Sequence, residues 1–200
     1  MSSVQSSSRI GSVRSAARVL LVGLLLAGIG SCSGAGGDDG TARRADLAPL
    51  LLTDSEIDAL DLGLMPKEAY STGEDYGAAT DEELSGPTER ATAAVVRQWT
   101  RDPRTTPDGV PWSVDSTVIE FSSPADAADA VDAIFALLGA TPTHLGNARY
   151  ALAPPEDGVS SGVALIGTDS TLQVAGAHFD GAADEAVIRE LAELLVARGR

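Results

Sequence analysis

The spacing of apolar residues changes several times along the chain, and each change predicts a different element. Apolar side chains that recur every three or four positions indicate amphipathic helices, whereas alternating or β-branched segments indicate strands. The helical spacing predicts helices over residues 53–62, 88–101, 124–138 and 181–198. The strand patterns occupy residues 113–122, 148–153, 161–167 and 171–177. The predicted order is therefore helix, helix, then β-α-β-β-β-α.

Short local motifs indicate where three of the helices begin. Thr53 and Glu56 have the spacing of a capping box, in which each side chain bonds the backbone N–H of the other residue. Ser123 precedes Pro124, and this pair supplies a cap and a first-turn residue that needs no N–H partner. Asp180 stands where it would cap the last helix. Each of these helices therefore has a predicted starting residue.

The arrangement of these elements predicts the fold class. Asp169 and Ser170 separate the last two strands by a tight turn, so these strands should pair as an antiparallel hairpin. Each amphipathic helix needs an apolar surface on which to bury its stripe. We therefore expect an α+β fold: a single small domain with an antiparallel or mixed sheet and helices on one face. Residues 64–87, rich in Gly, Pro and acids, predict a long exposed loop.

Residues 1–31 have the organisation of a secretory signal. Only positive charges precede an uncharged apolar run over residues 19–29. That run is shorter than the roughly 20 residues of a membrane-spanning helix, but it suits a signal peptide. The segment ends in Ile29-Gly30-Ser31-Cys32, which resembles the lipobox of bacterial lipoproteins. The resemblance implies lipid on Cys32 and cleavage just before it. An ordinary signal peptide and an uncleaved anchor are the alternatives.

The cysteine content agrees with lipidation. Cys32 is the only cysteine, so an internal disulfide is impossible, and without lipid a secreted chain would expose a leftover thiol. The Gly-rich residues after it lack apolar periodicity and predict a flexible tether. We thus divide the chain into a signal (1–31), a lipidated cysteine and tether (32–46), a short helix and acidic loop (47–87), and an α+β domain (88–198).

The charge of the chain argues against partners that carry phosphate groups. The formal net charge is −15, and removal of residues 1–31, whose only charged residues are three arginines, lowers it to −18. An acidic surface repels phosphate groups. We therefore expect no nucleic-acid binding and no adhesion of the folded domain to anionic lipid.

The residues needed for catalysis are scarce. The two histidines, His144 and His178, lie in different segments, and no catalytic or metal-binding motif accompanies them. We expect His178 to pair with Asp180 or to be exposed, and His144 to be exposed in a turn. Trp99 and Trp112 are expected to anchor the core, with a ligand pocket as the alternative. The sequence therefore predicts no enzyme and no cofactor.

Two groups of acidic residues are candidates for metal or catalytic sites. The first has the composition of a calcium loop but lacks the glycine at its sixth position, and Ile57 and Leu60 suit the buried face of a helix instead. The second recurs every three residues on a helix, as in a solvated stripe. We therefore predict no metal site in either. The two groups are Asp54, Glu56, Asp58 and Asp61, and Asp126, Asp129 and Asp132.

The order of elements over residues 113–198 resembles small extracytoplasmic domains of actinobacterial lipoproteins. It is similar, more loosely, to sensor domains outside membrane-spanning Ser/Thr kinases, although those usually carry paired cysteines. The resemblance implies no particular ligand. We expect a non-enzymatic binding or sensing domain, lipid-anchored on the outer face of the cell membrane, whose partner is an envelope protein, a glycan or a small apolar ligand. The alternative is a structural accessory that docks another cell-envelope protein through the acidic loop over residues 67–83.

Overall fold

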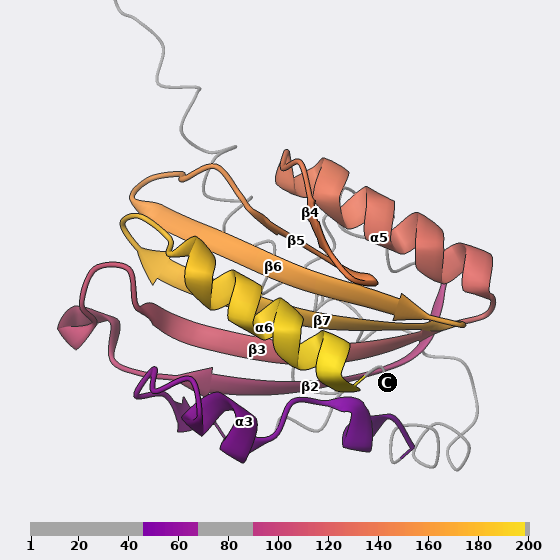
Figure 1. The fold of residues 1–200 in the computed structure, drawn as a ribbon, viewed down its shortest axis with the longest axis horizontal. Helices are drawn as coiled ribbons and strands as arrows, with labels where there is room; N and C mark the ends of the chain where they lie inside the picture. Colours follow the sequence, from indigo (N-terminus) through magenta and orange to yellow (C-terminus); the bar gives the residue numbers. More distant parts are fainter. Residues whose placement is uncertain (1–45, 68–89, 199–200) are drawn as a thin grey trace, which may run out of the picture.

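The computed structural model describes residues 46–67 and 90–198, so Cys32, nearly all of the tether and most of the predicted acidic loop lie outside the described residues. The described part contains a seven-stranded antiparallel sheet of order β1-β2-β3-β7-β6-β5-β4 (Figure 1). The strands are β1 (Met65–Pro66), β2 (Ala91–Thr100), β3 (Pro111–Phe121), β4 (Thr143–Leu145), β5 (Ala148–Leu152), β6 (Val159–Thr168) and β7 (Thr171–Asp180). The helices are α3 (Asp54–Asp58), α5 (Pro124–Leu138) and α6 (Glu185–Arg198), with 3-10 turns at Ala48–Leu50 and Pro103–Thr105.

The sheet is covered by helices on both faces. Alternate residues of β6 point to opposite sides, so Val163 and Leu165 join the apolar cluster of α5 while Ala164 and Ile166 join the cluster of α6. In Figure 1, α6 lies across the sheet and α3 lies beside β2 at the edge of the sheet; Glu56 of α3 bonds Arg198 at the end of α6. We call these two sides the α5 face and the α6 face. The predicted α+β class, with one small domain and an antiparallel sheet, is confirmed. The division of helices between two faces differs from the single covered face that we expected, because the central strands are apolar on both sides.

The predicted helix over residues 88–101 is wrong, because this segment forms β2. Val95, Val96 and Trp99 have a spacing that suits a helix face, but the segment is also rich in β-branched residues. In the structure β2 pairs with β3 along its length, which buries residues on alternate sides. Trp99 is fully buried in the cluster that includes α3. Long-range pairing therefore outweighed the local helical spacing.

The predicted helix starts are confirmed at α3 and α5 and wrong at α6. Thr53 forms the capping box with Glu56, and the Ser123 hydroxyl accepts the N–H of Asp126. At the third helix, Asp184 accepts the N–H of Ala186, while Asp180 is still the last residue of β7. The strand continues beyond the prediction because its final residues pair with the start of β6.

The hairpin between the last two strands is confirmed. Thr168 faces Thr171 across a two-residue turn in which Asp169 has a φ of 49°. The structure adds two strands that no pattern indicated, since β1 and β4 are only two and three residues long. Both lie at the edges of the sheet. Among the described residues, no helix combines the length and apolar character that a membrane span requires.

Candidate functional site

Polar residues occupy one end of the α5 face. Asp115 and Thr117 share this face of β3 with Ile119, because residues two apart in a strand point the same way. Ser161 of β6 and His178 of β7 lie on the same side. All four are buried, with Asp115 only 2% and His178 only 5% exposed. We call these four residues and Trp112 the polar cluster.

His178 is bonded to Ser161 on the neighbouring strand. The two residues lie directly opposite each other, and Ser161 Oγ is 3.0 Å from His178 Nδ1. The carbonyl of Ser161 accepts the N–H of Ala153, so its backbone groups face away from β7. Opposed residues that do not exchange backbone bonds have the closest side chains in an antiparallel pair. The strand register therefore positions this hydroxyl and imidazole.

The other side of the imidazole faces a carboxylate from β3. His178 Nε2 lies 3.7 Å from Asp115 Oδ1, which is close for an ion pair and too long for a hydrogen bond. The Trp112 ring stacks on His178 with 5.5 Å between centroids. β3 and β7 are adjacent in the sheet although 49 residues, 122–170, separate them in the chain. This adjacency brings hydroxyl, imidazole and carboxylate into one row.

The carboxylate of Asp115 is left without a donor. Both of its oxygens are buried and have no hydrogen-bond partner in the structure, and the same is true of Thr117 Oγ1 and Trp112 Nε1. Buried polar groups are nearly always bonded, so each exception needs an explanation. Here three side chains of one cluster are exceptions together. The cluster therefore has bonding capacity that the described residues do not fill.

A glycine makes room for this carboxylate. Gly176 on β7 lies directly across from Asp115, and a Cβ at Gly176 would come within 2.8 Å of Asp115 Oδ1. Glycine weakens the interior of a strand, and its presence there often marks a close approach. The carboxylate thus lies over a strand position that has no side chain.

Among the described residues, two other buried oxygen atoms also lack a partner, but each is separate from the polar cluster. Glu156 Oε2 belongs to the turn between β5 and β6. Gln173 Oε1 comes from a residue that shares the α6 face with Ala175 and Ala177. Neither has an unpaired neighbour of its own, so the polar cluster is the best candidate site in the described part of the chain.

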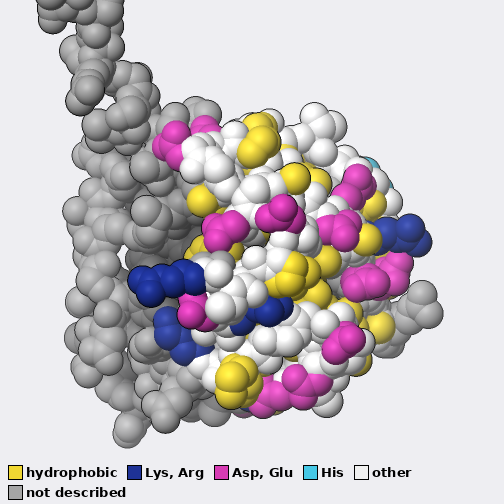
Figure 2. Space-filling view, turned by 90° about the vertical axis from the view of Figure 1, so that its left-hand side faces the viewer, with side chains coloured by type: hydrophobic (Ala, Val, Ile, Leu, Met, Phe, Trp, Pro, Cys, Tyr) yellow, Lys and Arg dark blue, Asp and Glu magenta, His cyan; other side chains and the backbone are white. Residues whose placement is uncertain are grey.

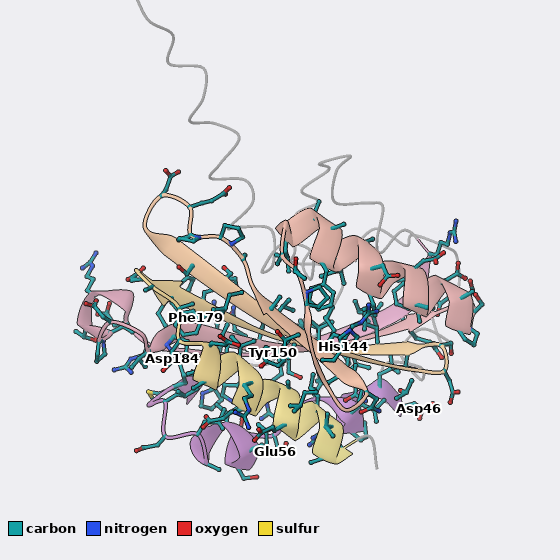
Figure 3. All side chains as sticks on the ribbon, turned by 45° about the horizontal axis from the view of Figure 1, so that its top comes forward. Asp46, Glu56, His144, Tyr150, Phe179 and Asp184 are labelled. Atoms are coloured by element: carbon teal, nitrogen blue, oxygen red, sulfur yellow. The ribbon has the colours of Figure 1, made fainter. Side chains whose placement is uncertain are left out.

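The structure corrects the expectation for His178, and for His144 it confirms the exposure but replaces the predicted turn by a strand. His178 is buried beside Ser161 and Asp115 instead of pairing with Asp180, which is exposed at the end of β7. His144 is exposed on the edge strand β4 (Figure 3). Asp115 and Thr117 were visible in the sequence as polar residues inside a β-rich segment, but their partners were not, because the adjacency of β3 and β7 has no local signal.

Two acids of the first group, Asp54 and Glu56, bind the N-terminal segment to the domain. Glu56 accepts two hydrogen bonds from Arg198 of α6, from Nε at 2.8 Å and Nη2 at 2.7 Å (Figure 3). Partial burial by itself would raise the pKa of Glu56, but the bonds from Arg198 and Thr53 outweigh it and hold this pKa at about 2. Asp54 accepts from Trp99 Nε1 and from Arg97. Among the described residues, no three His, Cys, Asp or Glu side chains are grouped as metal ligands.

The acids of the second group lie on the surface of α5 and are partly paired. Asp126 bonds Ser122, Ser123 and Arg90, and these bonds, that from Ser123 foremost, lower its pKa to about 2. Asp132 pairs with Arg149. Elsewhere on the surface, in the face shown in Figure 2, acidic side chains are dispersed among apolar and basic ones. They form no concentrated acidic site there.

The two tryptophans differ in their surroundings. Trp99 is fully buried in the α6-face core, as predicted. Trp112 is partly exposed and stacks on His178, so it belongs to the polar cluster and not to the apolar core. The prediction of a core anchor is thus wrong for Trp112, and the alternative of a ligand pocket stays a prediction for this residue.

Comparisons with known proteins give one likeness. No family model matches the chain, and no curated protein matches it. A solved structure similar to it is the extracellular domain of PknH from Mycobacterium tuberculosis, at 12% sequence identity and a TM-score of 0.48. The alignment covers 77% of this chain and 96% of that domain. This likeness assigns no ligand and no role to any residue.

Proposed function

We propose that the protein is a non-enzymatic binding or sensing domain, lipid-anchored through Cys32 on the outer face of the cell membrane, whose ligand binds at the polar cluster. One observation carries the binding site: both oxygens of Asp115 are buried without a donor. The anchor rests on the lipobox resemblance and on the single cysteine.

A purely structural role explains the cluster less well. Polar networks that stabilise a core have all their members bonded, because each unbonded buried group costs about 1–3 kcal/mol and a charged one costs more. In the polar cluster only Ser161 and His178 are bonded to each other, while Asp115, Thr117 and Trp112 keep unpaired atoms. Unsatisfied buried groups need an explanation, and a ligand that bonds to them supplies one.

A fragment screen on isotope-labelled protein tests the site. The probes are small anionic, neutral and cationic fragments, and the readout is the amide signals of Asp115 and Gly176 with the imidazole signals of His178. We expect at least one class to shift these signals saturably. Gly176→Ala should reduce the response, because its Cβ displaces the carboxylate. The matched control is Gly167→Ala, whose Cβ would meet only Val131 at 3.9 Å. A folded protein whose cluster signals respond to no class would refute the proposal.

A second candidate function, acyl transfer, is favoured by the order of Ser161, His178 and Asp115. In this chemistry Ser161 Oγ would attack an ester carbonyl while His178 takes the hydroxyl proton and later gives it to the leaving alcohol. A fluorophosphonate probe tests it, with Ser161→Ala as the variant and Ser160→Ala as the control. Ser160 is equally buried, but its hydroxyl bonds the carbonyl of Gly181 instead. Labelling that depends on Ser161 alone would establish this function in place of simple binding.

A further inference from the structure

The unpaired atoms of the polar cluster define what a ligand must supply. A carboxylate accepts hydrogen bonds at both oxygens and donates none, so Asp115 needs donors. The hydroxyl of Thr117 can accept as well as donate, and the indole N–H of Trp112 is a further unpaired donor. Acceptors therefore predominate, and the strongest of them carries a negative charge. A matching ligand group donates hydrogen bonds and is positive.

The described part of the protein does not supply this group itself. Gln98 of β2 lies directly opposite Asp115 of β3, but its amide donates to Ser113. His178 Nε2 is too distant to donate. The arginines seen in ion pairs all contact other acids: Arg90 contacts Asp126, Arg97 contacts Asp54, Arg149 contacts Asp132, Arg189 contacts Glu193, and Arg198 contacts Glu56.

A proton or a metal ion fits the cluster less well than a positive group that donates hydrogen bonds. Protonation of Asp115 would remove the charge but leave its second oxygen buried without a donor. A metal ion needs more ligands than one carboxylate and one imidazole, and no third ligand of the usual types is grouped with Asp115 and His178 in the described residues. A cation that carries its own N–H groups supplies both the positive charge and the hydrogen-bond donors that the carboxylate needs.

We infer that the polar cluster binds a cationic nitrogen group that bears N–H donors, an ammonium or a guanidinium, with Asp115 as its counter-ion. This inference rests on the proposed function and specifies the ligand class. Gly176 provides the space above β7 in which the carboxylate lies, and Thr117 lies two residues along the same face of β3. A charge-assisted bond between an N–H cation and a buried carboxylate is among the strongest hydrogen bonds in proteins.

Three simple salts test the inference directly. The probes are ethylammonium, methylguanidinium and tetramethylammonium chlorides at equal ionic strength, titrated while the signals of Asp115, Gly176 and His178 are recorded. Ethylammonium or methylguanidinium should give saturable shifts, and the two arms show which group is preferred. Tetramethylammonium has the same charge but no N–H donor, so it should produce no saturable shift.

Variants show whether the carboxylate is responsible. Asp115→Asn keeps the shape and removes the charge, so the affinity for the bound cation should fall about 10-fold or more. Asp129→Asn removes the same charge from the exposed surface of α5, and it should leave the affinity unchanged within about twofold. Thr117→Val, nearly isosteric, should weaken binding by a few fold and serves as a second variant if Asp115→Asn does not fold.

The outcomes separate this inference from the proposed function. If neutral or anionic fragments saturate the cluster signals and both N–H cations do not, the ligand class is wrong while the site stands. Equal binding of tetramethylammonium would show that charge alone is recognised, which would overturn the role of the N–H donors. If no fragment of any class binds, both the inference and the proposed function fail.

Discussion

Replacing Asp115 by asparagine should stabilise the protein when no ligand is bound. The substitution keeps the side-chain shape and removes a charge that is 2% exposed and has no hydrogen-bond donor. Most substitutions at buried positions destabilise a protein, so a gain in stability here would be unusual. It is expected because a residue kept for a ligand can be unfavourable to the empty fold.

The size of the effect follows from two opposing contributions. A buried ion without compensation costs roughly several kcal/mol even after the surroundings relax. The amide of asparagine, if unbonded, costs about 1–3 kcal/mol. The net gain should therefore be about 1–3 kcal/mol, or about 2–10 °C in Tm for a protein of this size.

Denaturant and thermal unfolding of the ligand-free protein measure this difference. Asp129→Asn is the control, since its exposed side chain should change the free energy of unfolding by less than about 0.5 kcal/mol. If Asp115→Asn instead destabilises the protein by about 1 kcal/mol or more, the carboxylate has a structural role, and the argument from its missing donors is refuted.

Three further predictions concern the anchor and the packing. Cys32→Ala should abolish the lipid mass and release the protein from the membrane fraction, as intact mass and partition experiments would show; unchanged partition would contradict the anchor. Glu56→Gln should lower the free energy of unfolding by about 1–2 kcal/mol. Because the pKa of Glu56 falls from 4.5 to about 2 on folding, the wild-type advantage should be complete above about pH 4.5 and disappear as the pH falls towards 2. Gly162→Ala should destabilise the domain by about 1–3 kcal/mol, since the new Cβ would collide with the side chain of Ile188, whereas Gly167→Ala has room; equal stabilities of the two variants would show that this contact is not tight.

Local sequence patterns predicted the elements of this fold well where each pattern fitted only one type of element. The caps at Thr53 and Ser123 depend on residues three positions apart, so the sequence contains the whole motif. The segment that forms β2 was predicted to be a helix because the spacing of its apolar residues fits a helix as well as a strand. Only its pairing with β3 and its burial on both sides decide between them, and those are properties of the folded sheet.

The polar cluster was beyond prediction for a related reason. Its members come from β3, β6 and β7, and the row forms only because β7 lies between the other two. The pairing of β6 with β7 was predicted from their short turn. The placement of β3 on the other side of β7 brings Asp115 to His178, and nothing near Asp115 in the sequence indicates that neighbour. The expectation for His178 therefore considered Asp180, the acid nearest in sequence, and missed the one nearest in space.

Two locally unfavourable residues meet at the polar cluster, and their combination argues for function more strongly than either does separately. Asp115 is a buried carboxylate without a donor, and Gly176 is a glycine in the interior of a paired strand, a position that disfavours glycine. Each alone lowers the stability of the sheet. They lie directly opposite each other, and the missing side chain of Gly176 provides the space that the carboxylate occupies. A sequence selected for stability alone would have a β-branched residue at either position, as the same face has at Ile119 and Val174 under α5. The α5 face is thus apolar where a helix covers it and polar where a ligand would complete it.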